Sequence, residues 1–143
     1  MKRLMVVGTF CLLACSQPSM AVDKSIYYGH WEGKSGNESI SLDIAKKEKA
    51  SLAINGASVN QPIRVEYIFS KISPYPFVSI LFMDEKQNEH LIYAVIGLGG
   101  EKEKSMLTGF YEKSHLIPGK DGELESVLEH LELVQQADAA HPK

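Results

Sequence analysis

Alternating apolar and polar positions recur along this chain and predict strands. From Ser39 to Ala45, Ile40, Leu42 and Ile44 fall on one face and polar residues on the other, which is the period of a half-exposed strand. Asn55-Gly56 is the dipeptide most typical of a two-residue hairpin. Further runs that predict strands cover residues 24–34, 50–54, 62–70 and 104–113. Together they predict an all-β chain, an antiparallel meander of seven to eight strands that forms a small barrel.

Two strongly apolar runs lie at the centre of this pattern, in the stretch from Pro74 to Phe110. Residues 77–83 and 90–97 are rich in β-branched and aromatic side chains and flank a polar break at residues 84–89, which predicts a hairpin. Both faces of the first run are apolar, with Phe77 on one and Val78 on the other. Such a hairpin needs a core on one face and a cover on the other, which is expected to be a terminal segment or the second subunit of a homodimer.

The segment from 122 to 135 fits two periods. Leu124, Val127 and Leu131 follow helical spacing after a cap at Asp121, whereas Val127, Glu129 and Leu131 alternate as in a strand. A closing strand is the favoured interpretation, because pairing it with the first strand would remove both open edges of the sheet. A helix would instead cover the outer face of the hairpin.

The first residues predict export. Lys2 and Arg3 precede an apolar stretch too short to span a bilayer, and Ala21 ends a small-x-small cleavage site, so residues 1–21 are expected to be a signal peptide. Cleavage before Cys15 is the alternative, because Leu12-Leu13-Ala14-Cys15 resembles a lipobox whose cysteine becomes lipidated. The expected location is the bacterial periplasm, either free or as an outer-membrane lipoprotein. Residues 22–136 are expected to form one barrel domain and residues 137–143 a disordered tail.

Processing also changes the charge and the cysteine content. Both cysteines lie in the leader, so no disulfide is expected in the mature chain. Removing Lys2 and Arg3 leaves thirteen basic residues against eighteen acidic ones, a net charge of about −5. Arg64 is then the last arginine left, which argues against a nucleic-acid partner. Contact with a membrane is expected only through the lipid anchor.

No motif predicts catalysis, a cofactor or a metal. The histidines lack the close spacings of metal ligands, although pairing of the last strand with the first could bring His30 near His130. The glycine-rich Gly97-Leu98-Gly99-Gly100 leads into a predicted strand, not into the helix that a phosphate-binding loop requires. The chain is therefore not expected to be an enzyme.

Gly29-His30-Trp31 in the first predicted strand, followed by the meander, resembles the calycin group of small barrels, which comprises lipocalins, fatty-acid-binding proteins and avidins. The resemblance implies structural roles for Gly29 and Trp31, with the tryptophan closing the bottom of a barrel that has an interior cavity. It does not extend to the arginine that lipocalins carry on the final strand, because none follows Arg64. Avidins line their pocket with several tryptophans and this chain has one, so biotin is not expected.

These features predict an exported, non-catalytic binding protein. The main hypothesis is a small apolar ligand held in the barrel interior; the expected lining is Tyr67, Phe69, Phe77, Leu81 and Phe110. The alternative is a periplasmic inhibitor or immunity protein that blocks a basic partner, such as a cell-wall-degrading enzyme or a toxin. Its expected contacts are Asp84, Glu85, Glu101 and Glu103.

Overall fold

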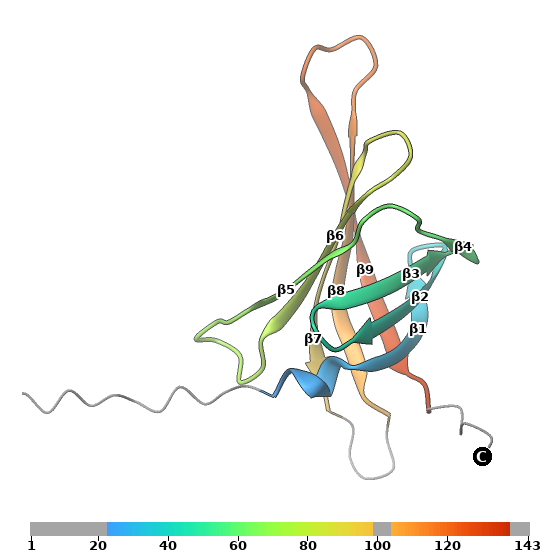
Figure 1. Cartoon of the computed structure of the whole chain (residues 1–143). Helices are drawn as coiled ribbons and strands as arrows, with labels where there is room; N and C mark the ends of the chain where they lie inside the picture. The colour runs from blue at the N-terminus through green and yellow to red at the C-terminus, as the bar shows by residue number, and fades with distance from the viewer. Residues whose placement is uncertain (1–22, 99–103, 138–143) are drawn as a thin grey trace, which may run out of the picture.

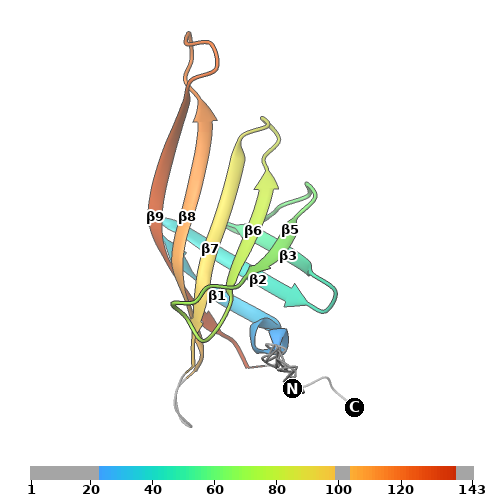
Figure 2. The ribbon, with the colours of Figure 1, turned by 90° about the vertical axis from the view of Figure 1, so that its left-hand side faces the viewer.

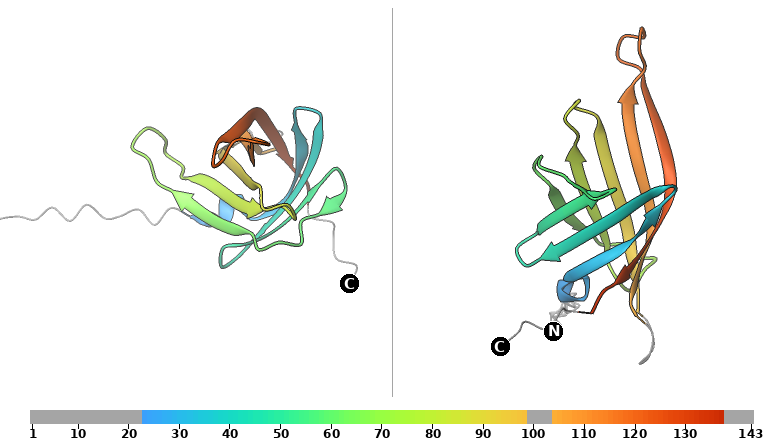
Figure 3. Two further views of the ribbon diagram at one scale, coloured as in Figure 1. Left: turned by 90° about the horizontal axis from the view of Figure 1, so that it is seen from above. Right: turned by 90° about the vertical axis from the view of Figure 1, so that its right-hand side faces the viewer.

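The computed structural model describes residues 23–98 and 104–137, which form one antiparallel sheet of nine strands. The strands are β1 (Gly29–Ser35), β2 (Glu38–Ala45), β3 (Lys49–Ile54), β4 (Ala57–Ser58), β5 (Arg64–Ile68), β6 (Phe77–Met83), β7 (Glu89–Gly97), β8 (Met106–Leu116) and β9 (Leu124–Gln135). Their order across the sheet is β4-β3-β2-β1-β9-β8-β7-β6-β5, and the sheet curls into a half-barrel (Figures 1 and 3). The predicted all-β meander is confirmed. In these two ranges, no helix is long and apolar enough to cross a membrane.

The inner face of the curled sheet carries the core. Along β2 the inward residues Ile40, Leu42 and Ile44 are buried, as the alternation predicts, and along β6 the inward residues are Val78, Ile80 and Phe82. The other buried apolar residues come from almost every strand: Tyr27, Trp31, Leu52, Val65, Ile92, Ala94, Ile96, Leu107, Tyr111, Leu131 and Leu133. The half-barrel is therefore filled by its own side chains over most of its length.

One end of the half-barrel, here called the closed end, is blocked by a short 3₁₀ turn, η1 (Lys24–Tyr27). The sequence predicted a strand over these residues, and this was wrong, because the Asp23 carboxylate caps the turn by accepting from Ser25 N. The turn directs the Tyr27 side chain into the core, where its hydroxyl donates to Pro76 O. Trp31, fully buried, donates its indole N–H to Tyr27 O at 2.9 Å.

Two glycines allow neighbouring strands to come very close where the sheet curls. A Cβ atom at Gly33 would lie 1.9 Å from Glu132 O, and one at Gly109 would lie 2.0 Å from Tyr93 O. Real Cβ atoms do not approach backbone oxygen so closely, so only glycine fits at either position. The first contact joins β1 to β9 and the second joins β8 to β7, all of which are central strands of the sheet.

The last segment is a strand, so the favoured interpretation is confirmed and the helix is not formed. β9 pairs with β8 over its whole length, from Met106↔Val134 to Leu116↔Leu124. It also pairs with β1, but only from Trp31↔Gln135 to Ser35↔Leu131. Pairing of the last strand with the first does not remove the edges, however. They lie in mid-sequence, at β4 and β5.

The chain between β4 and β5 explains where the sheet opens. The Asn55-Gly56 hairpin forms as predicted, with both residues at positive φ and Ile54 paired with Ala57. β4 then ends after two residues, and Pro62 lies just before β5, where it offers no N–H to a neighbouring strand. The half-barrel is therefore open between β4 and β5.

The outer face of β6, β7 and β8 is also apolar, as the sequence predicted for the central hairpin. Phe77 stacks on Tyr93 with ring centroids 5.0 Å apart, and Tyr93 stacks on Phe110 at 5.4 Å. These rings are half-buried against one another, and within the described ranges no second sheet packs over them.

Candidate functional site

The end of the half-barrel opposite η1, here called the open end, gathers most of the polar side chains that point inward. The β6–β7 loop at this end is organised by Asp84, whose carboxylate accepts four hydrogen bonds. Two come from the backbone N–H groups of Lys86 and Asn88, and one from the Asn88 amide. An aspartate that begins a turn and accepts from N–H groups further along is the usual Asx-turn arrangement.

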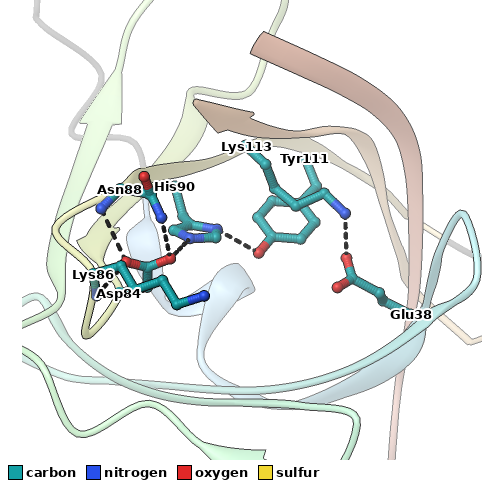
Figure 4. A network of polar contacts seen from close by, with 7 residues as sticks. All are labelled: Glu38, Asp84, Lys86, Asn88, His90, Tyr111 and Lys113. Carbon is teal, nitrogen blue, oxygen red and sulfur yellow. Dashed lines mark hydrogen bonds and ion pairs between the residues drawn. The ribbon is translucent and has the colours of Figure 1, made fainter. Parts of the chain in front are cut away.

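The fourth bond links this loop to His90, the first inward residue of β7. His90 Nε2 lies 3.1 Å from Asp84 Oδ2, and His90 Nδ1 lies 2.7 Å from the Tyr111 hydroxyl on β8 (Figure 4). The imidazole stacks on Phe82 of β6, with ring centroids 4.8 Å apart. Its side chain is only 13% exposed. We call Asp84, His90 and Tyr111 the His90 network.

The electrostatics of the network set the charge of its two end groups, Asp84 and Tyr111. Burial would raise the pKa of Asp84, but the hydrogen bonds from Asn88, His90 and Lys86 outweigh it and hold this pKa well below its ordinary value. Burial, assisted by nearby carboxylates, raises the pKa of Tyr111. Asp84 is therefore ionised and Tyr111 protonated at neutral pH. When the imidazole carries one proton, these states have Tyr111 donating O–H to Nδ1 and Nε2–H donating to Asp84.

An ion-paired lysine lies next to this network. Lys113 Nζ is 2.7 Å from Glu38 Oε2 and 3.4 Å from Glu129 Oε2, and it lies above the Tyr111 ring at 5.4 Å from the centroid. Burial would lower the pKa of Lys113, but these two carboxylates outweigh it and raise this pKa. The pairs join β8 to β2 and β9 across the open end (Figure 4).

A pocket of about 200 Å³ adjoins the His90 network at the gap between β4 and β5. We call it the mouth pocket. Phe82 and His90 belong to its wall, together with Met83, Asp84 and Glu85 of the same hairpin. The opposite wall is Ile54 and the connection after the Asn55-Gly56 turn: Ala57, Ser58, Val59, Asn60 and Gln61. Its surface is thus mainly apolar, with two amides and one exposed carboxylate, Glu85, at the rim.

The His90 network holds and orients an imidazole ring at the wall of the mouth pocket. Carboxylate, imidazole and hydroxyl lie in a line, an order used elsewhere to activate a hydroxyl nucleophile. Here the hydroxyl belongs to Tyr111, which is 1% exposed, so a substrate does not reach it. In residues 23–98 and 104–137, no group of three or more histidine, cysteine or acidic side chains is arranged to hold a metal ion.

His30 lies elsewhere, on the outer face of β1. Its ring nitrogens are 2.8 Å from Asp43 Oδ1 and 2.9 Å from Glu32 Oε1, and hydrogen bonds to Glu32 and Asp43 raise the pKa of His30. The expectation that strand pairing brings His30 near His130 is wrong. Gln136 N donates to His30 O, so the register sets His30 opposite Gln136, six residues beyond His130.

The five predicted ligand-binding residues do not surround one space. Tyr67 points inward near the closed end, where its ring is 5.5 Å from that of Tyr27 and burial raises its pKa to about 12. Phe77, Leu81 and Phe110 lie on the outer face, and Phe69 is exposed beyond the end of β5. Strand parity separates the two groups, because the predicted set mixed inward with outward positions.

Of the four predicted partner-binding acids, the structure describes Asp84 and Glu85. All four hydrogen bonds of the Asp84 carboxylate are internal, whereas Glu85 is exposed. Glu101 and Glu103 lie outside the described residues, as do Cys15 and residues 1–21, the predicted signal peptide. The strand ends that flank 99–103 lie at the closed end, where Tyr27 reaches Ile96 N. Asp84 and Glu85 are at the open end.

Sequence reasoning missed His90 and Tyr111 as site residues. The hairpin pairing Phe82↔His90 follows from a loop centred on Lys86, so the stacking of these two rings could have been found. Tyr111 could not, because its contact with His90 depends on the register of β7 with β8, Ile92↔Tyr111, across a long connection.

Comparisons with known proteins add no assignment to this geometry. No protein-family model, no curated protein and no solved structure matches the chain.

Proposed function

We propose that this chain is a non-catalytic binding protein that holds a small ligand in the mouth pocket. The observation that supports this most directly is the position of the pocket: it lies at the open end of an otherwise filled half-barrel, beside the stacked rings of Phe82 and His90. His90 is held on both sides by Asp84 and Tyr111, so the stacked surface is organised before a ligand arrives.

The size and lining of the pocket favour a particular class of ligand. Pockets for drug-sized molecules measure about 300–1,000 Å³. A volume of about 200 Å³ suits something smaller, such as one aromatic ring with a short substituent. The exposed carboxylate of Glu85 and the ring faces favour a cationic group on that substituent. The class is therefore a small amine with an apolar body.

Phenethylamine is a suitable probe, with 2-phenylethanol as its neutral counterpart. In a titration followed by ¹H–¹⁵N NMR, we expect shifts centred on Phe82, His90 and residues 57–61, and weaker binding of the alcohol. Ala57→Trp should abolish these shifts by filling the pocket, because Ala57 is exposed and lines it. Ala45→Trp is the matched control, an exposed position away from the pocket. Equal binding by the A57W and A45W variants, or shifts centred elsewhere, would contradict the proposal.

We also propose that the chain is exported to a bacterial periplasm and is related to the calycin barrels. The first statement is supported by the leader pattern and the second by Gly29-His30-Trp31 together with the curled sheet. Mass spectrometry of the protein from its host tests the first, because cleavage after Ala21 and lipid on Cys15 give different masses.

A further inference from the structure

The hairpin of β8 and β9 projects beyond the rest of the sheet at the open end (Figures 1 and 2). β1 pairs with β9 only as far as Ser35↔Leu131, and the Ser35 hydroxyl then donates to His130 O. From Leu124 to Glu129, β9 has β8 on one side and no strand of the described chain on the other. We call this stretch the free edge.

The direction of the backbone groups along the free edge follows from the parity of the strand. Gln136 N donates to His30 O on the β1 side, whereas Gln135 N donates to Ser105 O on the β8 side. Because successive residues of a strand present N–H and C=O to opposite sides, the even-numbered residues face the β1 side. The N–H and C=O groups of Leu124, Ser126 and Leu128 therefore point away from β8 into the free edge.

The side chains of the free edge are exposed from Leu124 to Leu128 and partly apolar, and Glu129 is half-buried. Leu124 is 64% exposed, Leu128 62% and Val127 42%. Leu124 and Leu128 share the outer face of the strand, and Val127 lies on the inner face between Glu125 and Glu129. An unpaired edge with such side chains is what proteins usually shorten, charge or cover, since it can accept an added strand.

The charge of the β8–β9 hairpin indicates which side chains an added strand would carry. Residues 112–129 contain five carboxylates and two lysines, a net charge of −3 with His115 neutral. A second copy of this chain fits poorly. The two-fold antiparallel registers that use most of the edge, centred on Ser126 or on Val127, set Glu123 or Glu125 directly opposite Glu129. Like charges in such pairs are destabilising. A basic strand would instead find two carboxylates on one face, the exposed Glu125 and also Glu129, which it would share with Lys113, and apolar side chains on the other.

We infer that the free edge of β9 docks an extended basic segment of a partner protein as an additional strand. The segment alternates, with lysine or arginine opposite Glu125 and Glu129 and apolar residues opposite Leu124 and Leu128. This interaction goes beyond ligand binding in the mouth pocket. It uses a different surface, so either proposal can fail without the other.

The probe is a fluorescein-labelled peptide that has this alternation when it pairs antiparallel to β9, Thr-Lys-Leu-Val-Thr-Lys-Leu, added to the full chain. We expect binding by fluorescence anisotropy that weakens about tenfold or more when both lysines of the peptide are replaced by glutamate, and that weakens at high salt. Hydrogen exchange gives the decisive readout. On binding, the amides of Ser126 and Leu128 should become protected, whereas that of Val127, which already faces β8, should not change.

Ser126→Pro removes one N–H group of the free edge and should weaken binding of the peptide by about tenfold. Ser126→Ala is the control, because it removes only the hydroxyl contact with Ser114. Binding without protection of the even-numbered amides, or with equal affinity in the S126P and S126A variants, would overturn the inference. Protection of these amides in the peptide-free protein, together with a dimer mass, would overturn it in favour of a second copy.

Discussion

At the scale of single residues, His90 connects a local turn, the one organised by Asp84, to Tyr111 on a strand farther along the chain. Asp84 organises its own turn through Lys86 and Asn88, which is a contact within five residues. Tyr111 reaches the same imidazole from a strand 21 residues away. The ring is fully hydrogen-bonded only when turn and register are both correct, so this network reports on the packing of β6, β7 and β8 together.

Tyr111→Phe tests the bond on the Tyr111 side. The change leaves His90 Nδ1 without its hydrogen-bond partner in a mostly buried place, and we expect the free energy of unfolding to fall by about 1–3 kcal/mol. Urea unfolding measures this. Tyr93→Phe is the control, since that ring lies on the outer face and its hydroxyl has no hydrogen-bond partner within the described chain. Equal stability of the Y111F and Y93F variants would show that the bond contributes nothing.

Asp84→Asn tests the other side of the ring and its dependence on pH. The pKa of Asp84 is lower in the folded chain than in the unfolded one, so the ionised carboxylate stabilises the fold above the ordinary carboxyl pKa of about 3.9. This stabilisation is lost as pH falls below that value. We therefore expect the D84N variant to be less stable than the parent at pH 7, with the difference shrinking toward pH 2. Urea unfolding of both proteins across this pH range measures the difference. A difference in stability that stayed constant from pH 7 to pH 2 would contradict the expectation.

At the scale of elements, the parts predicted correctly from the sequence are those set by neighbouring residues. The hairpin of β6 and β7 and the Asn55-Gly56 turn follow from local alternation and turn chemistry. The 3₁₀ turn at Lys24–Tyr27 was missed because Tyr27 is drawn inward by partners at Pro76 and Ile96. The role of Gly109 was likewise not predictable, since it depends on how closely β8 approaches β7.

Gly109→Ala tests that close approach. Its Cβ would meet Tyr93 O and Ala94 Cα, which are backbone atoms that cannot move without separating β7 from β8. We expect a loss of about 2–3 kcal/mol or more in unfolding free energy, as for other overpacked sites. Gly97→Ala is the control on β7, where the nearest atom to the new Cβ is Met106 O at an ordinary 3.8 Å. If the G109A variant were as stable as the G97A variant, curling of the sheet would not depend on this contact.

At the scale of the whole molecule, the pairing of the last strand with the first was predicted correctly, but the prediction that this pairing removes both edges of the sheet was wrong. β9 does pair with β1, yet the sheet still has two edges, because β4 stops after two residues and Pro62 precedes β5. The break therefore falls in mid-sequence, where the chain crosses the mouth pocket. A pattern of alternating residues predicts strands but says little about which neighbouring pair stays open.

This placement of the break predicts how the molecule opens. Strands at the two ends of the sheet have one neighbour each, whereas β8 has pairing on both sides along most of its length. Local opening begins where pairing and burial are least, so native-state hydrogen exchange should be fastest in β4 and β5. It should be slowest in β7, β8 and the part of β9 paired with β1. Exchange of β5 amides as slow as those of β8 would mean that β4 and β5 pair in solution and that the half-barrel closes. The mouth pocket, which lies between the β6–β7 hairpin and β4 with the residues that follow it, would then close with it.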